Sequence, residues 1–208
     1  MTMPFIIKHL GLQPYDTTWD AMQAFTNNRT PDTQDELWVV QHPPVFTQGL
    51  NGKAEHLLST HPTIPLVQTD RGGQVTYHAP GQLIIYILMD LKRARLGAKD
   101  FVHRIENALI ALLKEHYQLS AEARTDAPGV YVDGRKIASL GLKIRQFRSY
   151  HGLALNVDMD LEPFHWINPC GLVGMEMTQL SEHANEIDYA ALENQALDML
   201  RLHLSNTN

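Results

Sequence analysis

Three stretches of the chain carry apolar residues at helical spacing. The clearest covers residues 99–117, where apolar side chains recur every three or four positions, which predicts an amphipathic helix packed on a sheet. A second stripe, from Leu192 to Leu200, follows Asp188, a residue type that favours helix N-caps. A third pattern begins near Thr17 or Thr18. Each predicts a helix with one buried face.

Six segments between these helices have the pattern of β-strands. They cover residues 37–41, 66–69, 82–91, 129–132, 136–144 and 152–157. The run 82–91 is almost wholly apolar, which is typical of a strand buried on both faces. Asp133-Gly134 separates two of the runs and favours the positive φ angles of a type I′ hairpin turn. Because there is no regular βαβ repeat, we predict an α+β fold with a mixed, largely antiparallel sheet flanked by helices.

The bulk composition limits the organisation and the partners. With 208 residues, 44% of them hydrophobic, and with no repeat or linker, the chain is expected to form one domain over residues 1–208. A formal net charge of -6 argues against general nucleic-acid or anionic-membrane binding. The N-terminus lacks the features of a signal peptide, and the longest apolar run, 83–89, is too short to cross a bilayer. We therefore expect a cytoplasmic protein without a membrane span.

Cys170 is the only cysteine of the chain, so no internal disulfide can form. A lone cytoplasmic cysteine is usually a small buried apolar residue. Here Pro169 and Gly171 interrupt regular structure and favour a loop, where reactive groups are common. An ordinary thiol with a pKa of about 8.5 is mostly protonated at neutral pH, so a nucleophilic role would need a base or a cation nearby.

Lys136 could supply that base. Alternate residues of its strand are Lys136, Ala138, Leu140, Leu142 and Ile144. Because side chains alternate between the faces of a strand, Lys136 is expected to share the apolar face. Removal from water disfavours an ammonium ion, which would make the amine a usable general base near neutral pH. The alternative is that Lys136, next to the turn, extends its ammonium group to water.

A glycine-containing segment, Arg71-Gly-Gly-Gln-Val-Thr-Tyr-His78-Ala-Pro-Gly-Gln82, leads directly into the buried strand. It matches neither a phosphate-binding P-loop nor a dinucleotide-binding fingerprint. Its two adjacent glycines allow a ligand to approach the backbone, although an ordinary turn would use them equally well. His78 could carry a proton, position a ligand or be a hydrogen-bonded core residue.

Other catalytic arrangements are less well marked. The chain has no His-Glu-x-x-His or paired Cys-x-x-Cys spacing, so we do not expect a metal site. A Cys-His-Asp arrangement with His78 or His151 as the base stays open, because the order of the residues in the sequence does not decide it.

Several of these motifs occur together and in a fixed order. They are Arg71–His78 with Pro80-Gly-Gln82, Ala127-Pro-Gly-Val-Tyr-Val132, Gly134-Arg-Lys-Ile137, Ser139-Leu-Gly141, His151-Gly-Leu-Ala-Leu-Asn-Val157 and Asn168-Pro-Cys-Gly171. In this combination, over roughly residues 9–180, the chain closely resembles the lipoyl(octanoyl) transferases.

The resemblance implies a fold shared with biotin and lipoate protein ligases. It also implies an acyltransferase of lipoate biosynthesis that moves octanoyl from acyl carrier protein to lipoyl domains of 2-oxoacid dehydrogenases and to the glycine cleavage H protein. In that family the residue matching Cys170 carries the acyl group, and the one matching Lys136 activates it. The implied acyl-binding residues are Arg71, Gly72, Gly73, Gln74, Val75, Thr76, Tyr77, His78, Ser139, Leu140, Gly141, Gly152, Leu153 and Ala154.

The implied donor carries phosphopantetheine and is already a thioester, so neither ATP nor a metal is expected as a cofactor. Both partners are typically acidic, which calls for a local basic docking site on an acidic enzyme. One candidate group of basic residues comprises Lys92, Arg93, Arg95, Lys99 and Arg104, and a second comprises Lys143, Arg145 and Arg148.

Three rival functions remain at this stage. An ATP-dependent lipoate or biotin ligase would share the fold, but His78 is followed here by Ala-Pro-Gly and not by the His-Asp ending of the ligase loops. A non-catalytic acyl-binding or carrier-binding module would keep the fold without using Cys170. A cysteine hydrolase would use water in place of the amine acceptor.

Overall fold

A seven-stranded sheet forms the centre of the protein in a computed structural model that describes residues 5–59 and 63–205. The strand order is β1 (Ile6–Leu12), β2 (Glu36–Gln41), β6 (Gln82–Leu88), β10 (Arg148–Asn156), β9 (Arg135–Arg145), β8 (Gly129–Val132) and β7 (Ala121–Ala123). β1 and β2 run parallel, and every other neighbouring pair is antiparallel. The prediction of a mixed, largely antiparallel sheet is confirmed.

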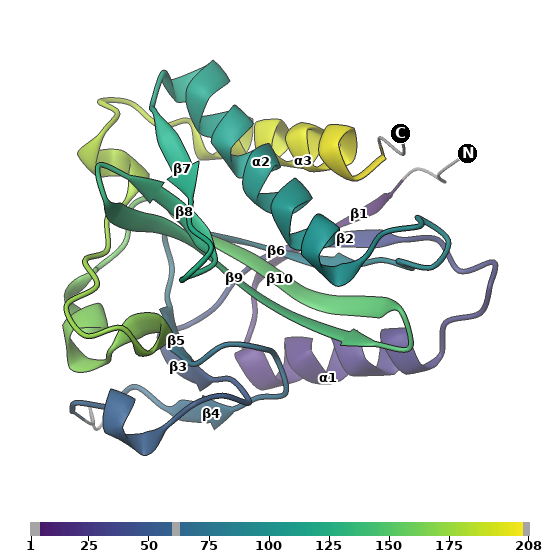
Figure 1. Ribbon diagram of the computed structural model, residues 1–208, viewed down its shortest axis with the longest axis horizontal. Coiled ribbons are helices and arrows are strands. Elements are labelled where there is room, and N and C mark those ends of the chain that lie inside the picture. Colours follow the sequence, from purple (N-terminus) through teal and green to yellow (C-terminus); the bar gives the residue numbers. More distant parts are fainter. Residues whose placement is uncertain (1–4, 60–62, 206–208) are drawn as a thin grey trace.

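A smaller sheet packs beside the large one (Figure 1). Its order is β4 (Leu66–Gln68), β3 (Val45–Gln48) and β5 (Val75–His78), with β3 parallel to β4 and antiparallel to β5. Short 3₁₀ helices lie in the connections, at η1 (Ala54–His56), η2 (Glu162–Trp166), η3 (Pro169–Gly171) and η4 (Leu180–Glu182). η3 contains Cys170, whose side chain lies outside the described part of the structure.

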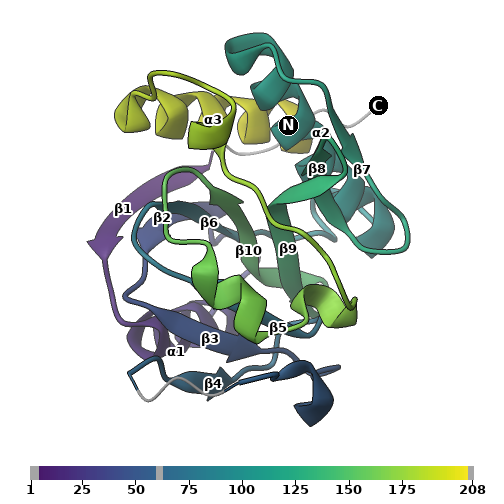
Figure 2. The same cartoon turned by 90° about the vertical axis from the view of Figure 1, so that its left-hand side faces the viewer.

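The three long helices cover the two faces of the large sheet. α2 (Ala98–Tyr117) and α3 (Tyr189–Ser205) lie side by side on one face, whereas α1 (Tyr15–Asn27) lies on the other with the small sheet (Figures 1 and 2). The backbone N–H of Ala191 donates to the Asp188 carboxylate at 3.1 Å, which confirms the predicted cap of α3. Within the described ranges, none of the helices is long and apolar enough to cross a bilayer.

β6 connects two hydrophobic cores, as expected for a strand buried on both faces. Leu83, Ile85 and Ile87 pack towards α2 and α3, and the alternate residues Ile84 and Tyr86 pack towards α1. The Asp133-Gly134 turn also forms as predicted, with φ angles of 50° and 77°. The sequence pattern therefore located the central layers correctly.

Candidate active site

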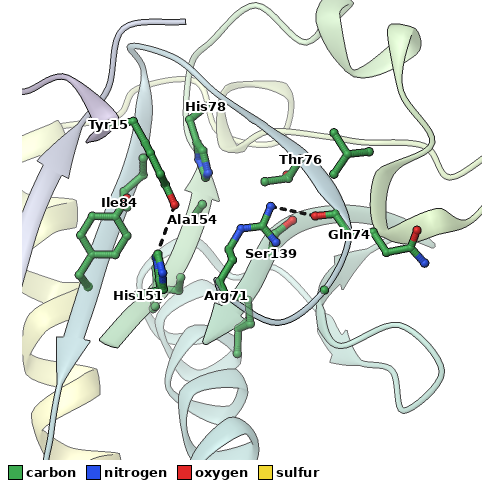
Figure 3. A pocket seen from close by; sticks show the side chains of 16 residues that line it. Tyr15, Arg71, Gln74, Thr76, His78, Ile84, Ser139, His151 and Ala154 are labelled. Atoms are coloured by element: carbon green, nitrogen blue, oxygen red, sulfur yellow. Dashed lines mark hydrogen bonds between the residues drawn. The ribbon is translucent and has the colours of Figure 1, made fainter. Parts of the chain in front are cut away.

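A cavity lies between the small sheet and the face of the large sheet that α1 covers (Figure 3). About 490 Å³ of empty space lies between its lining atoms, including the open solvent at its mouth. The lining comprises Tyr15 of α1; Arg71, Gly73, Gln74, Val75, Thr76 and His78 of β5 and the loop before it; and Ile84, Tyr86, Ser139, Leu140, Gly141, His151, Gly152, Leu153 and Ala154 of the large sheet.

The loop before β5 closes around the Arg71 guanidinium group. Arg71 Nη2 donates to the carbonyl oxygen of Thr47 at 2.6 Å and to that of Gln74 at 2.8 Å. Arg71 Nη1 donates to the carbonyl oxygen of Gly72 at 2.9 Å. These bonds hold the curved backbone in place, and Gly73 adopts the φ of +84° that the curve requires. Arg71 therefore shapes the cavity wall.

Two paired glycines leave room for close packing at the cavity wall. Gly141 of β9 lies opposite Gly152 of β10. A Cβ atom on Gly141 would lie 2.9 Å from the Cδ atom of Arg71, and one on Gly152 would lie 2.1 Å from the carbonyl oxygen of Ile85. Gly141 thus lets the Arg71 side chain approach β9, and Gly152 lets β10 pack closely against β6.

His78 is a buried neutral residue at the cavity wall. Burial lowers its pKa to about 3, and the neighbouring His42 contributes in the same direction. Its Nδ1 lies 2.8 Å from Gln82 Oε1, and its Nε2 lies 3.3 Å from Thr47 Oγ1. Since Gln82 uses its amide nitrogen to donate to Asn156, His78 Nδ1 is the donor in the first contact. Both ring nitrogens of His78 therefore have partners within the protein.

His151 forms a second buried group with Asp70 and Tyr15. Its Nε2 lies 3.0 Å from Asp70 Oδ1, and its Nδ1 lies 3.4 Å from the Tyr15 hydroxyl (Figure 3). Burial would raise the pKa of Asp70, but hydrogen bonds from His151 and Tyr150 outweigh it and hold that pKa well below its usual range. Burial lowers the pKa of His151 and raises that of Tyr15 to about 12, so Tyr15 donates to a neutral imidazole. His151 keeps a backbone φ of 59°, which is unusual outside glycine.

The expected face of Lys136 is wrong, although its burial is confirmed. Tyr131 of β8 lies opposite Lys136, and the preceding residue, Val130, lies opposite Ala138. Ile137 therefore has no partner in the register and forms a β-bulge. The bulge places Lys136 on the face of Tyr131 and Ser139, not on that of Ala138. The side chain is completely buried all the same.

Lys136 is held by residues of β8 and by Pro128 just before that strand. Its Nζ donates to the carbonyl oxygen of Pro128 at 2.9 Å and lies 5.5 Å from the centre of the Tyr131 ring. A Cβ atom on Gly129 would lie 2.5 Å from Lys136 Cε, so the lysine side chain passes directly over this glycine. The alternative of an ammonium group extended to water does not occur.

The segment that contains Cys170 links two parts of the site. Gly171 lies against Gln74, since a Cβ atom on Gly171 would be 2.2 Å from Gln74 Nε2. Farther along, Lys136 N–H donates to the carbonyl oxygen of Glu176, and Thr178 N–H donates to that of Lys136, each at 2.9 Å. The chain thus runs from the cavity wall at Gly171 to Lys136, which it meets through residues 40 and 42 positions away in the sequence.

Most of the acyl-binding residues implied by the resemblance line the cavity. Gly72 and Tyr77 do not: Gly72 N–H donates to the carbonyl oxygen of Leu142, and Tyr77 packs in the core of the small sheet. The cavity adds Tyr15, Ile84, Tyr86 and His151, of which only His151 was considered in the sequence. Alternation along the buried strand could have indicated Ile84 and Tyr86, whereas no local signal marks Tyr15. No cluster of three or more metal-binding side chains occurs among the described residues.

Two solved ligase structures have the same fold as this chain. The chain matches a putative lipoate protein ligase from T. acidophilum with a TM-score of 0.78 and 15% sequence identity, over 97% of this chain and 86% of that one. A biotin protein ligase from Aquifex aeolicus matches with a TM-score of 0.59 and 13% identity, over 98% of this chain and 69% of that one. The expected biotin and lipoate ligase-like fold is confirmed.

Sequence relatives are more specific. The lipoyl protein ligase A/B catalytic domain model matches residues 14–201. An octanoyltransferase from Hydrogenovibrio crunogenus is 65% identical over 91% of both chains, and one from Chromobacterium violaceum is 56% identical over 99% of this chain and 98% of its own. The chain therefore belongs to the lipoyl protein ligase A/B catalytic domain family and, within it, to the octanoyltransferases.

Proposed function

We propose that this acyltransferase carries octanoyl as a thioester on Cys170 and moves it from acyl carrier protein to a lysine of a lipoyl domain. The observation that carries the proposal is the placement of a buried lysine, Lys136, on the same face of β9 as Ser139, which lines the cavity. Cys170 is the only thiol of the chain and lies on a segment that touches Gln74 in the same cavity.

In the first half-reaction Lys136 acts as base and then as acid. Its amine takes the Cys170 proton, and the thiolate attacks the carbonyl carbon of the carrier thioester. The tetrahedral intermediate expels the pantetheine sulfur, which takes the proton back from the Lys136 ammonium group. An amine can donate one N–H to the Pro128 carbonyl group and still accept a proton through its lone pair, so the observed contact fits this role.

In the second half-reaction the neutral acceptor amine attacks the acyl-enzyme. The carbon–sulfur bond to Cys170 breaks, an amide bond forms, and the surplus amine proton returns to the thiolate through Lys136. Backbone N–H groups near Cys170 or in the loop before β5 would stabilise the oxyanion. His78 and His151 are less suited to the base role, because burial lowers the pKa of both and so makes each a weaker base, and each is hydrogen-bonded within the protein.

The acyl chain is proposed to occupy the cavity. Gln74 lies at one end of it, Ser139 lies near the middle beside Arg71, and Tyr15, Ile84 and His151 lie at the other end (Figure 3). Because Gly171 touches Gln74, we place the thioester at the first end and the methyl end of the chain near Ile84. Apolar walls with a few fixed polar groups are typical of sites for small acyl ligands.

A thioester donor makes ATP unnecessary, because cleavage of the thioester supplies the driving force for acyl transfer. We therefore propose an enzyme that uses neither ATP nor a metal. We also propose a single catalytic domain located in the cytoplasm, where its carrier and lipoyl-domain partners would be found. The family model over residues 14–201 supports one domain, as does the large sheet, because β6 packs on α2 and α3 through one face and on α1 through the other.

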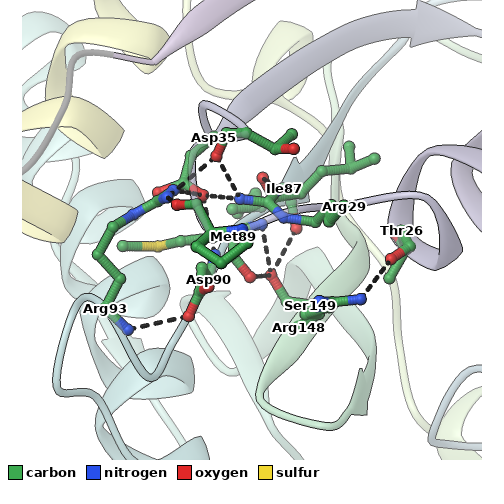
Figure 4. A network of polar contacts seen from close by, with 12 residues as sticks. Thr26, Arg29, Asp35, Ile87, Met89, Asp90, Arg93, Arg148 and Ser149 are labelled. Carbon is green, nitrogen blue, oxygen red and sulfur yellow. Dashed lines mark hydrogen bonds and ion pairs between the residues drawn. The ribbon is translucent and has the colours of Figure 1, made fainter.

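The two candidate basic groups meet at one end of the large sheet. Lys92, Arg93 and Arg148 line the same surface hollow, next to exposed Phe147. Arg93 is already paired, since its Nη2 donates to Asp35 at 2.6 Å (Figure 4). Arg145, at the end of β9 near this hollow, is nine residues from Lys136. At the usual rise per strand residue, this separation is about 30 Å. This distance favours a carrier docking site nearer to η3.

Intact-mass measurement tests the proposed function. The protein is mixed with octanoyl-carrier protein without ATP, and we expect an octanoyl mass on the enzyme that hydroxylamine removes. In Cys170→Ser, the octanoyl mass should not appear on the enzyme, or should appear far more slowly than in the wild-type protein. Failure of the wild-type protein to acquire the mass would contradict the proposal, and modification of an added lipoyl domain only with free octanoate and ATP would indicate a ligase. Release of octanoate before any acceptor is added would indicate a hydrolase.

A further inference from the structure

Glu106 is a buried carboxylate within the apolar face of α2. Its relative exposure is 3%, and it lies between the core residues Ile105 and Leu109. Burial of an unpaired carboxylate is costly, so such a residue needs hydrogen-bond donors. Glu106 Oε1 accepts the backbone N–H of Gly129 at 3.0 Å, and Oε2 lies 3.3 Å from His103 Nδ1 on the exposed side of the helix.

The contact between Glu106 and Gly129 leads directly to Lys136. The N–H of Gly129 and the C=O of Pro128 belong to one planar peptide group. The carbonyl oxygen of that group accepts the Lys136 Nζ donor at 2.9 Å. A carboxylate on the N–H side draws negative charge towards the carbonyl oxygen, because consecutive hydrogen bonds polarise one another. Lys136 thus interacts with the charge of Glu106 through a single peptide group.

Two features hold this peptide group in position. Gly129 has a φ of +145° and leaves room for Lys136, since a Cβ atom would lie 2.5 Å from Lys136 Cε and 2.6 Å from the carbonyl oxygen of Ala138. Lys136 itself is held on this face by the bulge at Ile137. The positions of Glu106, the Pro128–Gly129 peptide group and Lys136 are therefore fixed by α2, β8 and β9 together.

We propose that Glu106 is a positioning residue for Lys136, acting through the Pro128–Gly129 peptide group. It holds the amine next to the cavity, and its charge stabilises the ammonium group that forms when Lys136 takes the Cys170 proton. This inference rests on the proposed function, in which Lys136 activates Cys170. Glu106 contacts neither the substrate nor the thiol in this account.

The single cysteine makes the proposal measurable without a carrier protein. Iodoacetamide reacts with thiolates, so its rate with the native chain reports on Cys170 alone. At pH 7 the rate depends on the help of Lys136, whereas at pH 10 an ordinary thiol ionises without a base. We expect Glu106→Gln to lower the rate about tenfold at pH 7, equivalent to about 1.4 kcal/mol, and to leave it unchanged at pH 10.

His103→Gln is the matched control. It removes the exposed partner of Glu106 and keeps the Gly129 contact, so the alkylation rates at both pH values should match those of the wild-type protein. Thermal unfolding of each variant shows whether it is folded. Rates that fall equally at pH 7 and pH 10 in Glu106→Gln would indicate a structural role only and would overturn the proposal.

Enzyme acylation provides the second readout. With octanoyl-carrier protein, Glu106→Gln should lower the maximal single-turnover acylation rate about tenfold without changing the half-saturating donor concentration. A wild-type rate in the folded variant would overturn the inference while leaving the Cys170 thioester intact. Absence of acylation in the wild-type protein would instead contradict the proposed function itself. The two failures are therefore distinguishable.

Discussion

Lys136 and Ser139 lie on the same face of β9 although an odd number of positions separates them. A strictly alternating strand would place them on opposite faces. Ile137 is an extra residue in the β-bulge, so the alternation of side chains continues from Lys136 to Ala138 as if Ile137 were absent. Lys136 therefore lies on the face on which Ser139 lines the cavity. Bulges often occur next to active sites because they redirect one side chain without breaking the sheet.

The close packing of Lys136 on Gly129 predicts a specific cost for a methyl group. In Gly129→Ala the new Cβ atom would meet both Lys136 Cε and the carbonyl oxygen of Ala138. We expect a loss of about 1–3 kcal/mol of stability, measured by urea unfolding, together with slower acylation of Cys170. Gly134→Ala is the control, since Gly134 also has a positive φ but has nothing within 4 Å of an added Cβ atom. Equal acylation rates in the two variants would contradict the account of Lys136.

The position of Ile84 at one end of the cavity predicts a change in acyl-chain preference. Ile84→Ala should raise the rate with a decanoyl donor relative to octanoyl several-fold, because each newly buried CH₂ contributes about 0.8 kcal/mol. Competition between the two acyl-carrier donors measures the ratio. Ile85→Ala is the control, since Ile85 is equally buried but faces α2 and α3. A ratio that changes equally in both variants would show that Ile84 has no special place in the site.

Two buried histidines predict how stability depends on pH. Burial lowers the pKa of His78 to about 3 and that of His42 to about 4. Both values lie below the value of about 6.5 expected in the unfolded chain, so the unfolded state binds more protons below pH 6.5. This stability is therefore fully present above pH 6.5 and is lost as the pH falls through the folded-state pKa values of about 4 and about 3. Urea unfolding at pH 7.5 and pH 5.5 should differ by about 1.4 kcal/mol for each histidine. His78→Gln should remove one such contribution, and an undiminished difference in that variant would contradict the assignment.

The separation of the basic hollow from Lys136 predicts a small effect of charge reversal there. Lys92→Glu should leave the acylation rate close to that of the wild-type protein, even at low ionic strength, where surface charges act most strongly. Arg93→Glu should instead destabilise the fold, because it would place a carboxylate beside Asp35. Acylation kinetics and thermal unfolding separate the two effects. A large, salt-dependent loss of acylation in Lys92→Glu would identify the hollow as the carrier docking site after all.

Periodicity predicted the elements that bury a continuous apolar face. α2, α3 and β6 follow this rule, and the turn at Asp133-Gly134 follows local backbone chemistry. α1 begins at Tyr15, slightly earlier than the pattern suggested, after Pro14. β10 is longer than predicted because its first residues pair with Arg145 and Ile144 across the hairpin.

The elements that were not predicted lack such a face. β1 is a half-exposed edge strand, and β7 has only three residues. β3 and β5 are short and become strands by pairing with each other. The bulge at Ile137 was not predicted, although Lys136 is the one charged residue in its otherwise apolar alternate set and Ile137 is an apolar residue in the other set. A one-residue shift in the alternation accounts for both. The site residues came mainly from the ordered motifs, and Tyr15 reaches the cavity only through the tertiary packing of α1.

The most direct test of the central claim is transfer from the isolated acyl-enzyme. The protein is acylated with octanoyl-carrier protein, separated from the donor and mixed with a lipoyl domain, and both masses are followed over time without ATP. We predict that octanoyl leaves Cys170 and appears in equal amount on the acceptor lysine, at a rate no slower than overall turnover. An acyl-enzyme that persists, or that decays to free octanoate while the acceptor stays unmodified, would contradict the account.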